Sequence, residues 1–271
     1  MDLDDPRLPG VFDELPLWSA PFGLRLLERV RMRPGLSVLD VGCGAGFPLL
    51  ELAQRLGPGC RAVGLDPWSG GLLRARDKAL AWGVSQATLV RGVAERLPLK
   101  DACLDLVVSN NGLNNMANAA AALAECHRVL RPGGQLVATM NLPETMAAFY
   151  AAFEATLVEL GLAGRVEAMR RHIHEKRKPL HETRALLRDA GFAVEAEDLD
   201  EFRWRFLDGR ALFRHFFIRL GFLEAWQAVV APVDVARVFA ALEARLDLSA
   251  AQQGGLDLAI PFVCFDCRRQ P

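Results

Sequence analysis

The stretch VLDVGCGAGFPLL, from Val38 to Leu50, decides the fold. A short apolar run leads into a turn with three glycines, Gly42, Gly44 and Gly46, and leucines at helical spacing follow. A glycine-rich turn between a buried strand and a helix is a common cradle for a nucleotide. The stretch therefore predicts an α/β domain with a nucleotide site at this turn.

Apolar runs of strand length and helical patterns alternate along the chain. Strands are expected at 37–42, 61–66, 87–92, 104–110, 135–140, 192–199 and 259–267. Helices are expected at 22–30, 47–56, 68–82, 117–130, 144–160, 164–178 and 179–190. Strands that alternate with helices of this length form β-α-β units, so we expect a mostly parallel sheet.

Composition and charge exclude several classes of protein. The 271 residues carry a formal net charge of −1, which argues against binding of nucleic acids through many phosphate contacts. No apolar run is long enough for a transmembrane helix, and the N-terminal MDLDDPRLPG lacks the basic and apolar regions of a signal peptide. Six cysteines spread along this long chain fit reduced thiols better than a disulfide scaffold, so we expect a cytoplasmic protein without a membrane span.

Two carboxylates narrow the choice of nucleotide. The spacing G-x-G-x-G differs from the dinucleotide pattern G-x-G-x-x-G, and the lysine motif of triphosphate sites is absent. Asp40, just before the glycines, would repel a pyrophosphate but suits a cationic group. Asp66 closes the second predicted strand, where a carboxylate can accept both ribose hydroxyls. A site for a ribose and a cation, without a phosphate, fits S-adenosylmethionine.

Five motifs in this order resemble those of class I S-adenosylmethionine-dependent methyltransferases, of the broad type that includes ubiquinone and menaquinone biosynthesis enzymes. The motifs are VLDVGCGAG, GLDP, AERLP, LDLVVSN and RVLRPGG. The resemblance covers about residues 35–140. It implies an α/β fold with a Rossmann-like sheet of seven strands in the order 3-2-1-4-5-7-6, the last strand antiparallel. It also implies S-adenosylmethionine as the cofactor and S-adenosylhomocysteine as the product.

The resemblance implies a set of residues around the cofactor. They are Trp18, Asp40, Gly42, Gly44, Gly46, Asp66, Pro67, Ala94, Glu95 and Asn110. The glycines would let the backbone approach the methionine part of the cofactor, because a side chain there would collide with it. Asp40 would act on the ammonium group, and Asp66, with Pro67 beside it, would bind the ribose. Asn110 would face the methionine group near the reactive sulfur.

The adenine side departs from the family pattern. Members often have Gly-Asp-Ala before the Glu-x-Leu-Pro stretch, and that aspartate accepts a hydrogen from the adenine amino group. This chain has Gly92-Val93-Ala94 instead. Ala94 and Glu95 would still line the adenine, whose amino group would meet Glu95, a backbone carbonyl or water.

The chain is expected to have four parts. Residues 1–34 would form an N-terminal helical lid segment, and residues 35–199 the cofactor-binding core with a helical insertion at 143–178. An aromatic-rich helical cap would span 200–258, and the final core strand 259–271. In the lid segment, Trp18 or Phe22 would either shield the sulfonium with an aromatic face or anchor the helix on the sheet.

The expected cap concentrates large aromatic side chains. They are Phe202, Trp204, Phe206, Phe213, Phe216, Phe217, Phe222 and Trp226. They either pack the cap helices onto the sheet edge or line an apolar pocket for a flat or lipophilic acceptor. His215 lies among them and is a weak candidate for a catalytic base, since a packing role also fits it.

Two other groups of side chains have competing interpretations. His172 and His174 lie in a basic helical segment that is either a solvated face or a clamp for an anionic substrate. Cys264 and Cys267 are interpreted as structural thiols, because no second cysteine pair has zinc spacing. No metal site is expected.

The function that the sequence favours is methyl transfer to a small-molecule acceptor. Such a transfer needs positioning above all, and a base only where the acceptor is protonated, so the lack of a catalytic triad is no objection. An alternative is a non-catalytic sensor or partner subunit that binds S-adenosylmethionine. Methylation of tRNA or DNA and NAD-linked oxidoreduction have weaker support.

Overall fold

The computed structural model describes residues 16–270, which form two compact units. The core unit comprises residues 16–141, 180–200 and 262–270. The cap unit comprises residues 142–179 and 201–261. Two strands, β6 (Phe192–Phe206) and β7 (Leu256–Arg269), belong partly to each unit.

The core unit is built on a seven-stranded sheet with the order β3-β2-β1-β4-β5-β7-β6. Its first five strands are β1 (Ser37–Val41), β2 (Arg61–Asp66), β3 (Ala87–Arg91), β4 (Leu104–Asn110) and β5 (Leu130–Asn141). They pair in parallel, whereas β7 pairs with β5 in the antiparallel direction. The strand order and the reversed last strand confirm the sequence prediction.

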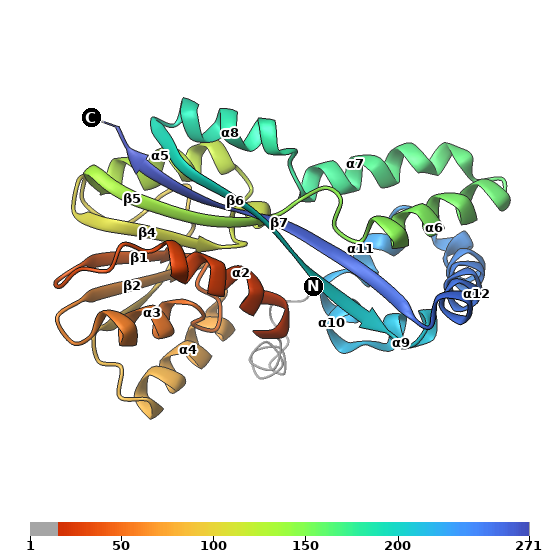
Figure 1. Cartoon of the computed structure of the whole chain (residues 1–271), viewed down its shortest axis with the longest axis horizontal. Helices are drawn as coiled ribbons and strands as arrows, with labels where there is room; N and C mark the ends of the chain where they lie inside the picture. Colours follow the sequence, from red (N-terminus) through yellow and green to blue (C-terminus); the bar gives the residue numbers. More distant parts are fainter. Residues whose placement is uncertain (1–15, 271) are drawn as a thin grey trace. The chain divides into compact units, whose positions relative to one another are not determined.

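Helices cover both faces of the parallel strands (Figure 1). The helices α3 (Leu49–Leu56) and α4 (Ser69–Ala81) lie on one side, and α5 (Ala119–Val129) and α8 (Leu180–Asp189) lie on the other. Because both faces are covered, β1 and β4 are almost wholly buried, which explains their mostly apolar sequences. The helix α2 (Pro16–Arg29) packs on β4 and β5.

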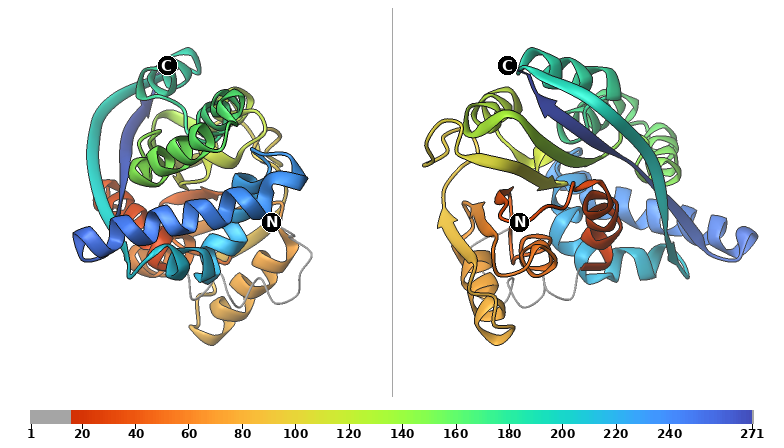
Figure 2. Two further views of the ribbon diagram at one scale, coloured as in Figure 1. Left: turned by 90° about the vertical axis from the view of Figure 1, so that its right-hand side faces the viewer. Right: turned by 60° about the vertical axis from the view of Figure 1, so that its left-hand side comes forward.

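The cap unit is helical apart from its portions of β6 and β7. Its helices are α6 (Ala147–Glu159), α7 (Val166–Lys176), α9 (Gly209–Arg214), α10 (Phe216–Gly221), α11 (Leu223–Gln227) and α12 (Val235–Gln253). The long α12 packs against α6 and α9 (Figures 1 and 2). Aromatic side chains pack at the centre of this unit. The fully buried Trp226, for example, stacks on Phe149 with ring centroids 4.0 Å apart.

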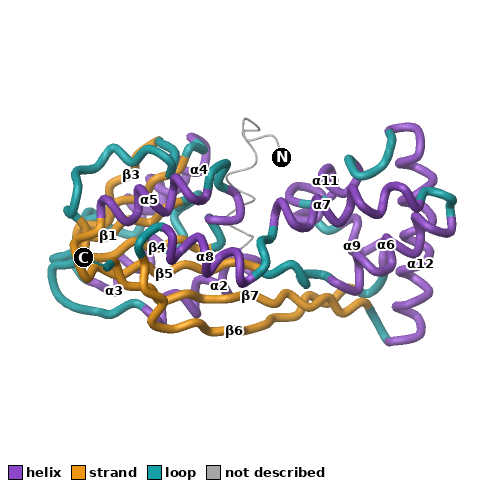
Figure 3. Tube along the Cα trace, turned by 90° about the horizontal axis from the view of Figure 1, so that it is seen from above, coloured by secondary structure: helices purple, strands orange, loops and turns teal. Residues whose placement is uncertain are grey.

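Three strands are longer than the sequence predicts. The expected end of the sixth strand at residue 199 is wrong, because β6 continues to Phe206. Trp204 and Phe206 therefore lie on a strand and not on a cap helix. The last strand, β7, begins at Leu256, so two long strands run side by side (Figure 3). The fifth strand begins at Leu130 and includes the proline-glycine stretch that we expected before it.

Candidate functional site

The glycine turn after β1 is bonded to the end of β2. The N–H groups of Gly42 and Cys43 both donate to the carbonyl oxygen of Leu65, at 2.8 and 3.2 Å. The N–H of Gly44 donates to Asp66 Oδ2 at 2.8 Å. These bonds join the carboxyl ends of two neighbouring strands, at the edge where open α/β sheets bind ligands.

The three glycines of the turn share a left-handed backbone but have different surroundings. Gly42, Gly44 and Gly46 have φ values of +81°, +50° and +100°. A Cβ atom on Gly44 would meet nothing within 4 Å, and one on Gly42 would meet only Gly112 Cα, at 3.6 Å. A Cβ on Gly46 would lie 3.0 Å from Leu50 Cδ1. The first two glycines thus present bare backbone to open space, whereas the third allows α3 to pack closely.

Asp40 is a buried carboxylate without a counter-charge. Its side chain is fully buried, and in the described part of the chain neither oxygen makes a hydrogen bond. Burial, with a contribution from the negative charge of Asp66, raises the pKa of Asp40 to about 8. The Leu49 N–H lowers this pKa in part but does not reach the geometry of a hydrogen bond. A cationic group beside Asp40 would supply the missing partner.

Asp66, at the end of β2, has both oxygens engaged by the backbone. Its Oδ2 accepts the Gly44 N–H and its Oδ1 accepts the Trp68 N–H, each at 2.8 Å. Burial raises the pKa of Asp66, and these two hydrogen bonds offset part of the rise. Each carboxylate oxygen has two lone pairs, so both can accept a further donor. Asp66 therefore orders the turn and keeps the capacity to accept hydroxyl hydrogens.

The helix α2 reaches the carboxyl end of β4. Asn110 Nδ2 donates to the carbonyl oxygen of Ser19 at 3.1 Å, and Asn110 Oδ1 accepts from Thr139 Oγ1 at 3.0 Å. A Cβ on Gly23 would lie 2.3 Å from Phe47 Cε1, so a glycine is needed where the helix passes the turn. The segment before β1 thus lies against the glycine turn and against Asn110.

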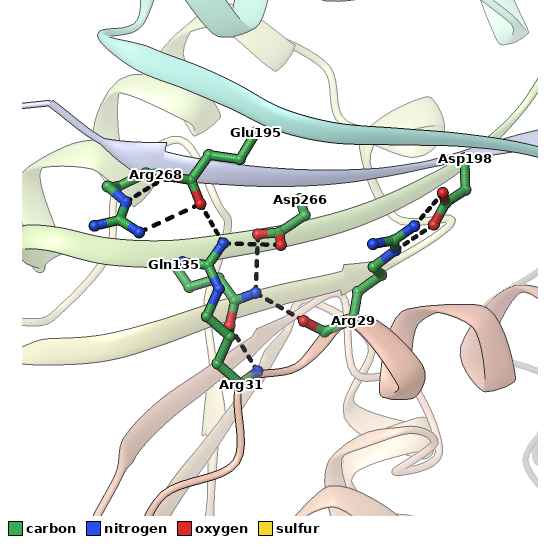
Figure 4. A network of polar contacts seen from close by, with 7 residues as sticks. All are labelled: Arg29, Arg31, Gln135, Glu195, Asp198, Asp266 and Arg268. Atoms are coloured by element: carbon green, nitrogen blue, oxygen red, sulfur yellow. Dashed lines mark hydrogen bonds and ion pairs between the residues drawn. The ribbon is translucent and has the colours of Figure 1, made fainter.

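A polar network on β5, β6 and β7 fixes the C-terminal end of α2 (Figure 4). Arg29 pairs with Asp198 of β6. Gln135 Nε2 donates to the Arg29 carbonyl oxygen at 2.8 Å and to Asp266 Oδ1 at 2.9 Å. Arg31 Nη2 donates to Asp266 Oδ2 at 2.9 Å. The helix is therefore held on the sheet at both ends.

Two aromatic side chains of α2 have different surroundings. Phe22 is fully buried and meets Phe262 edge-on with ring centroids 4.8 Å apart, so it anchors the helix on the sheet. Trp18 is half-buried and lies edge-on to Phe22 at 5.6 Å. Its contact with the cofactor stays a prediction.

The residues expected on the adenine side follow β2 and β3. Pro67 is exposed, Ala94 is buried and Glu95 is half-buried. Glu95 Oε1 accepts the N–H of Asn118 just before α5, at 3.0 Å. Val93, which replaces the aspartate of the family pattern, is 48% exposed. Glu95 is thus the carboxylate nearest in sequence to Val93, and one of its oxygens already accepts the Asn118 N–H.

An asparagine cluster that the sequence analysis missed lies next to Asn110. Asn111 has a φ of +55°, and its N–H donates to the carbonyl oxygen of Thr139 at 3.0 Å. Its Oδ1 accepts from Asn114 Nδ2 at 3.0 Å and from the Asn141 N–H at 3.2 Å. Asn114 Oδ1 is buried without a partner in the described residues. The run SNNGLNN after a predicted strand was the available signal for this polar wall.

Comparisons with known proteins agree with this geometry. Residues 39–138 match the family model described as a methyltransferase domain. A demethylmenaquinone methyltransferase of Bacillus cytotoxicus is 34% identical over 118 residues, which are 44% of this chain and 50% of that protein. An uncharacterised 37.1 kDa protein in transposon TN4556 of Streptomyces fradiae is 38% identical over 112 residues, 41% of this chain and 32% of that protein.

The match places residues 39–138, which lie in the core unit, with the methyltransferase domains that the sequence motifs resemble. The crystal structure of the YcgJ protein from Bacillus subtilis shares the fold of this chain, with a TM-score of 0.62 and 16% identity over 93% of this chain and 99% of that chain. The chain spans about a third to a half of the length of the curated relatives named above.

S-adenosylmethionine is the cofactor that the resemblance implies for the matched domain, and the residues at the glycine turn fit it. The open backbone at Gly42 and Gly44 can accommodate the amino-acid part, where a side chain would intrude. Asp40 lacks the partner that an ammonium group would provide. Asp66 retains acceptor capacity for sugar hydroxyls.

Other polar side chains of the protein have structural surroundings. The His127 ring lies edge-on to Phe192, and a Cβ on Gly191 would lie 2.7 Å from its Nε2, so it packs between elements. His215 belongs to the cap unit, where its ring lies edge-on to Trp204 and Phe206, each at 5.3 Å. Burial lowers the pKa of His215, and its Nδ1 is buried without a partner within residues 16–270.

The described residues offer neither a set of metal ligands nor a membrane-spanning helix. No group of three His, Cys, Asp or Glu side chains within residues 16–270 could hold a metal ion. Cys264 and Cys267 are both buried free thiols on β7. In the same range, no helix combines the length and apolar character needed to cross a membrane.

Proposed function

We propose that this chain transfers the methyl group of S-adenosylmethionine to a small-molecule acceptor. The observation that carries the proposal is a bare glycine turn next to a buried carboxylate, Asp40, that has no partner of its own. This combination favours a ligand with a positive charge and no phosphate. A pyrophosphate would be repelled by both Asp40 and Asp66.

The proposed roles of the site residues follow from their placement. The backbone at Gly42 and Gly44 would receive the amino-acid part of the cofactor, and Asp40 would balance its ammonium group. Asp66, already fixed by two backbone N–H groups, would accept the ribose hydroxyls. Because its oxygens are positioned before the ligand arrives, little ordering is needed on binding.

Further contacts are proposed for the residues around the turn. Ala94 and Glu95 would line the adenine, with Pro67 beside the ribose. Gly46 would act indirectly, by letting α3 pack against the turn. Asn110 and Trp18 would lie near the methionine group, since Asn110 bonds to the residue that follows Trp18.

The cofactor, when bound, supplies a methyl group already activated by a positively charged sulfur. The chain would then contribute mainly by positioning the acceptor and excluding water. The asparagine cluster beside Asn110 offers amide groups that can orient a polar acceptor atom without a charged base. A base is needed only where the acceptor is protonated.

A small, flat acceptor such as a quinone is the substrate class we propose. Support comes from the similarity to a protein named demethylmenaquinone methyltransferase and from the near-neutral net charge of −1. A nucleic-acid acceptor would call for a basic surface that neutralises phosphates.

The test is formation of S-adenosylhomocysteine in the presence of S-adenosylmethionine and a panel of quinols, phenols and amines. We expect turnover with at least one flat acceptor and none with RNA or DNA. Binding of S-adenosylhomocysteine without turnover on the whole panel would favour the non-catalytic alternative. Salt-dependent binding of RNA would favour a nucleic-acid substrate.

A further inference from the structure

Arg177, the residue that follows α7, is buried in the cap unit without an opposite charge. The residue is only 3% exposed. Its Nη1 donates to the Tyr150 hydroxyl oxygen at 3.2 Å, and its guanidinium lies 5.5 Å from the centre of the Tyr150 ring. No carboxylate within the described residues pairs with Arg177. Its positive charge is therefore not neutralised by this part of the chain.

The Tyr150 hydroxyl already accepts two hydrogen bonds. Trp226 Nε1 donates to the same oxygen at 3.0 Å, in addition to Arg177. A tyrosine hydroxyl has two acceptor positions and one donor, so only its O–H hydrogen is left. Tyr150 is 5% exposed, and no acceptor for this hydrogen exists among residues 16–270. The O–H group of Tyr150 is thus a buried hydrogen-bond donor without an acceptor in residues 16–270.

The remaining donors of Arg177 keep an opening to solvent. Its Nε and Nη2 make no hydrogen bond within the described part of the chain. Neither atom belongs to the fully buried atoms that lack a partner, so both retain some exposed surface. The unused N–H groups are therefore not fully enclosed by the described residues.

A guanidinium is costly to bury unless an anion accompanies it. The Tyr150 ring face and one neutral hydrogen bond recover only part of that cost. The unused donors are the planar fork of an arginine and a hydroxyl hydrogen, which together match the oxygens of a phosphate or a carboxylate. The chain supplies donors here, and an oxyanion would supply the acceptors.

We infer that Arg177 and Tyr150 form a binding site for an oxyanion, a phosphate or carboxylate group, in the cap unit. The inference goes beyond methyl transfer and does not depend on it, because the site lies wholly in the cap unit. It also places a specific residue in the clamp for an anionic substrate that was one interpretation of the basic segment around His172. The oxyanion is either a free ion or part of an organic molecule, and the two sources can be separated.

The first test is thermal unfolding of the full chain in inorganic phosphate, with sodium chloride of equal ionic strength as the reference. At about ten times the dissociation constant, phosphate should raise the melting temperature by about 3 °C. Arg177→Met should abolish this rise. The matched control is Arg171→Met, which removes an exposed arginine of α7 and should keep the rise.

A second variant guards against loss of the fold. Arg177→Lys keeps the positive charge but loses the planar fork, so phosphate should bind about tenfold more weakly. A phosphate effect of equal size in wild type and Arg177→Met overturns the inference, as does no effect beyond that of sodium chloride in wild type. Binding of S-adenosylhomocysteine to the same samples reports separately on the cofactor site.

The source of the oxyanion is tested with phenyl phosphate and benzoate. Binding tighter than that of inorganic phosphate assigns the site to an organic ligand, and equal binding assigns it to a free ion. His172 provides a local signal, because burial and the charges of Arg177 and Lys176 lower its pKa, while Glu175 opposes them. A bound oxyanion should raise the pKa of His172 in an NMR titration and leave that of His127 unchanged. Equal movement of both histidines contradicts a local site.

Discussion

The core unit and the cap unit each bury an ionisable side chain for which residues 16–270 supply no group of opposite charge. In the core unit it is the carboxylate of Asp40, which makes no hydrogen bond. In the cap unit it is the guanidinium of Arg177, which has a tyrosine but no acid beside it. Keeping such a group charged and unpaired inside a protein costs about several kcal/mol, because the charge loses its hydration. Such residues therefore indicate ligands of opposite charge.

The two charges differ in how well they were visible in the sequence. Asp40 stands inside an ordered set of motifs, so its chemistry could be read from neighbours in the chain. Arg177 lies in a basic segment of the sequence, where most arginines and lysines are solvated. Its burial and its hydrogen bond to Tyr150 distinguish it from the exposed Arg171. The core site is marked by an ordered series of local motifs, whereas Arg177, Tyr150 and Trp226 lie far apart in the sequence and only the structure brings them together.

The largest effect is expected at the open glycine of the turn. Gly44→Val should abolish binding of S-adenosylhomocysteine, because its side chain would fill the space in front of the backbone. The matched control is Gly83→Val, which also has a positive φ and open surroundings but lies after α4. Both variants should lose similar stability, about 1–2 kcal/mol from the left-handed backbone. Calorimetry that finds binding in Gly44→Val would count against the turn as the cofactor site.

Asp40→Asn should change how stability depends on pH. The folded-state pKa of Asp40 is raised to about 8 from an ordinary value of 3.8, so the native state holds a proton that the unfolded state has released. Stability should therefore fall as the pH rises from about 4 to 8, by on the order of 1 kcal/mol per pH unit. Asp40→Asn should flatten this slope in denaturant titrations without ligand. A wild-type slope equal to that of the variant would refute the buried, uncompensated carboxylate.

Asp66→Ala should weaken binding of S-adenosylhomocysteine by about 1–3 kcal/mol, the range for a charged hydrogen-bond partner. It should also lower stability, because the N–H groups of Gly44 and Trp68 lose their acceptor. Asp77→Ala is the control, since this aspartate is exposed on α4. Unchanged affinity of Asp66→Ala in calorimetry would remove the ribose role.

The smallest effect is expected at His215. His215→Phe should leave binding of S-adenosylhomocysteine unchanged and shift unfolding by less than about 1 kcal/mol, because it removes a buried, unpartnered Nδ1 from an aromatic cluster. Loss of turnover with normal stability and cofactor binding would instead make His215 a catalytic group.

The sheet could be predicted from the sequence because its central strands are buried on both faces. The predicted bounds of β2 and β4 agree with the structure, since each is an apolar run that ends at a polar residue. The length of β6 was missed, although Phe202, Trp204 and Phe206 alternate with charged residues up to its end. That period of two was the usable signal, and grouping the aromatics with the cap concealed it.

Parts of the cofactor site could not be predicted for a different reason. The second role of Asp66, as acceptor for the Gly44 N–H, joins residues that are 22 positions apart through a backbone group. The bond from Asn110 to the Ser19 carbonyl oxygen spans 91 positions. Any residue supplies such a backbone group, so no residue type in the sequence marks it. Side-chain chemistry was readable, whereas the contacts that hold those side chains depend on the fold.

The most direct test of the central claim is calorimetry of S-adenosylhomocysteine binding at pH 7 in two buffers with different heats of ionisation. An ammonium group beside Asp40 should lower its pKa from about 8, so binding should release up to one proton in wild type and none in Asp40→Asn. Equal proton release in both proteins, or no binding at all, would contradict the account.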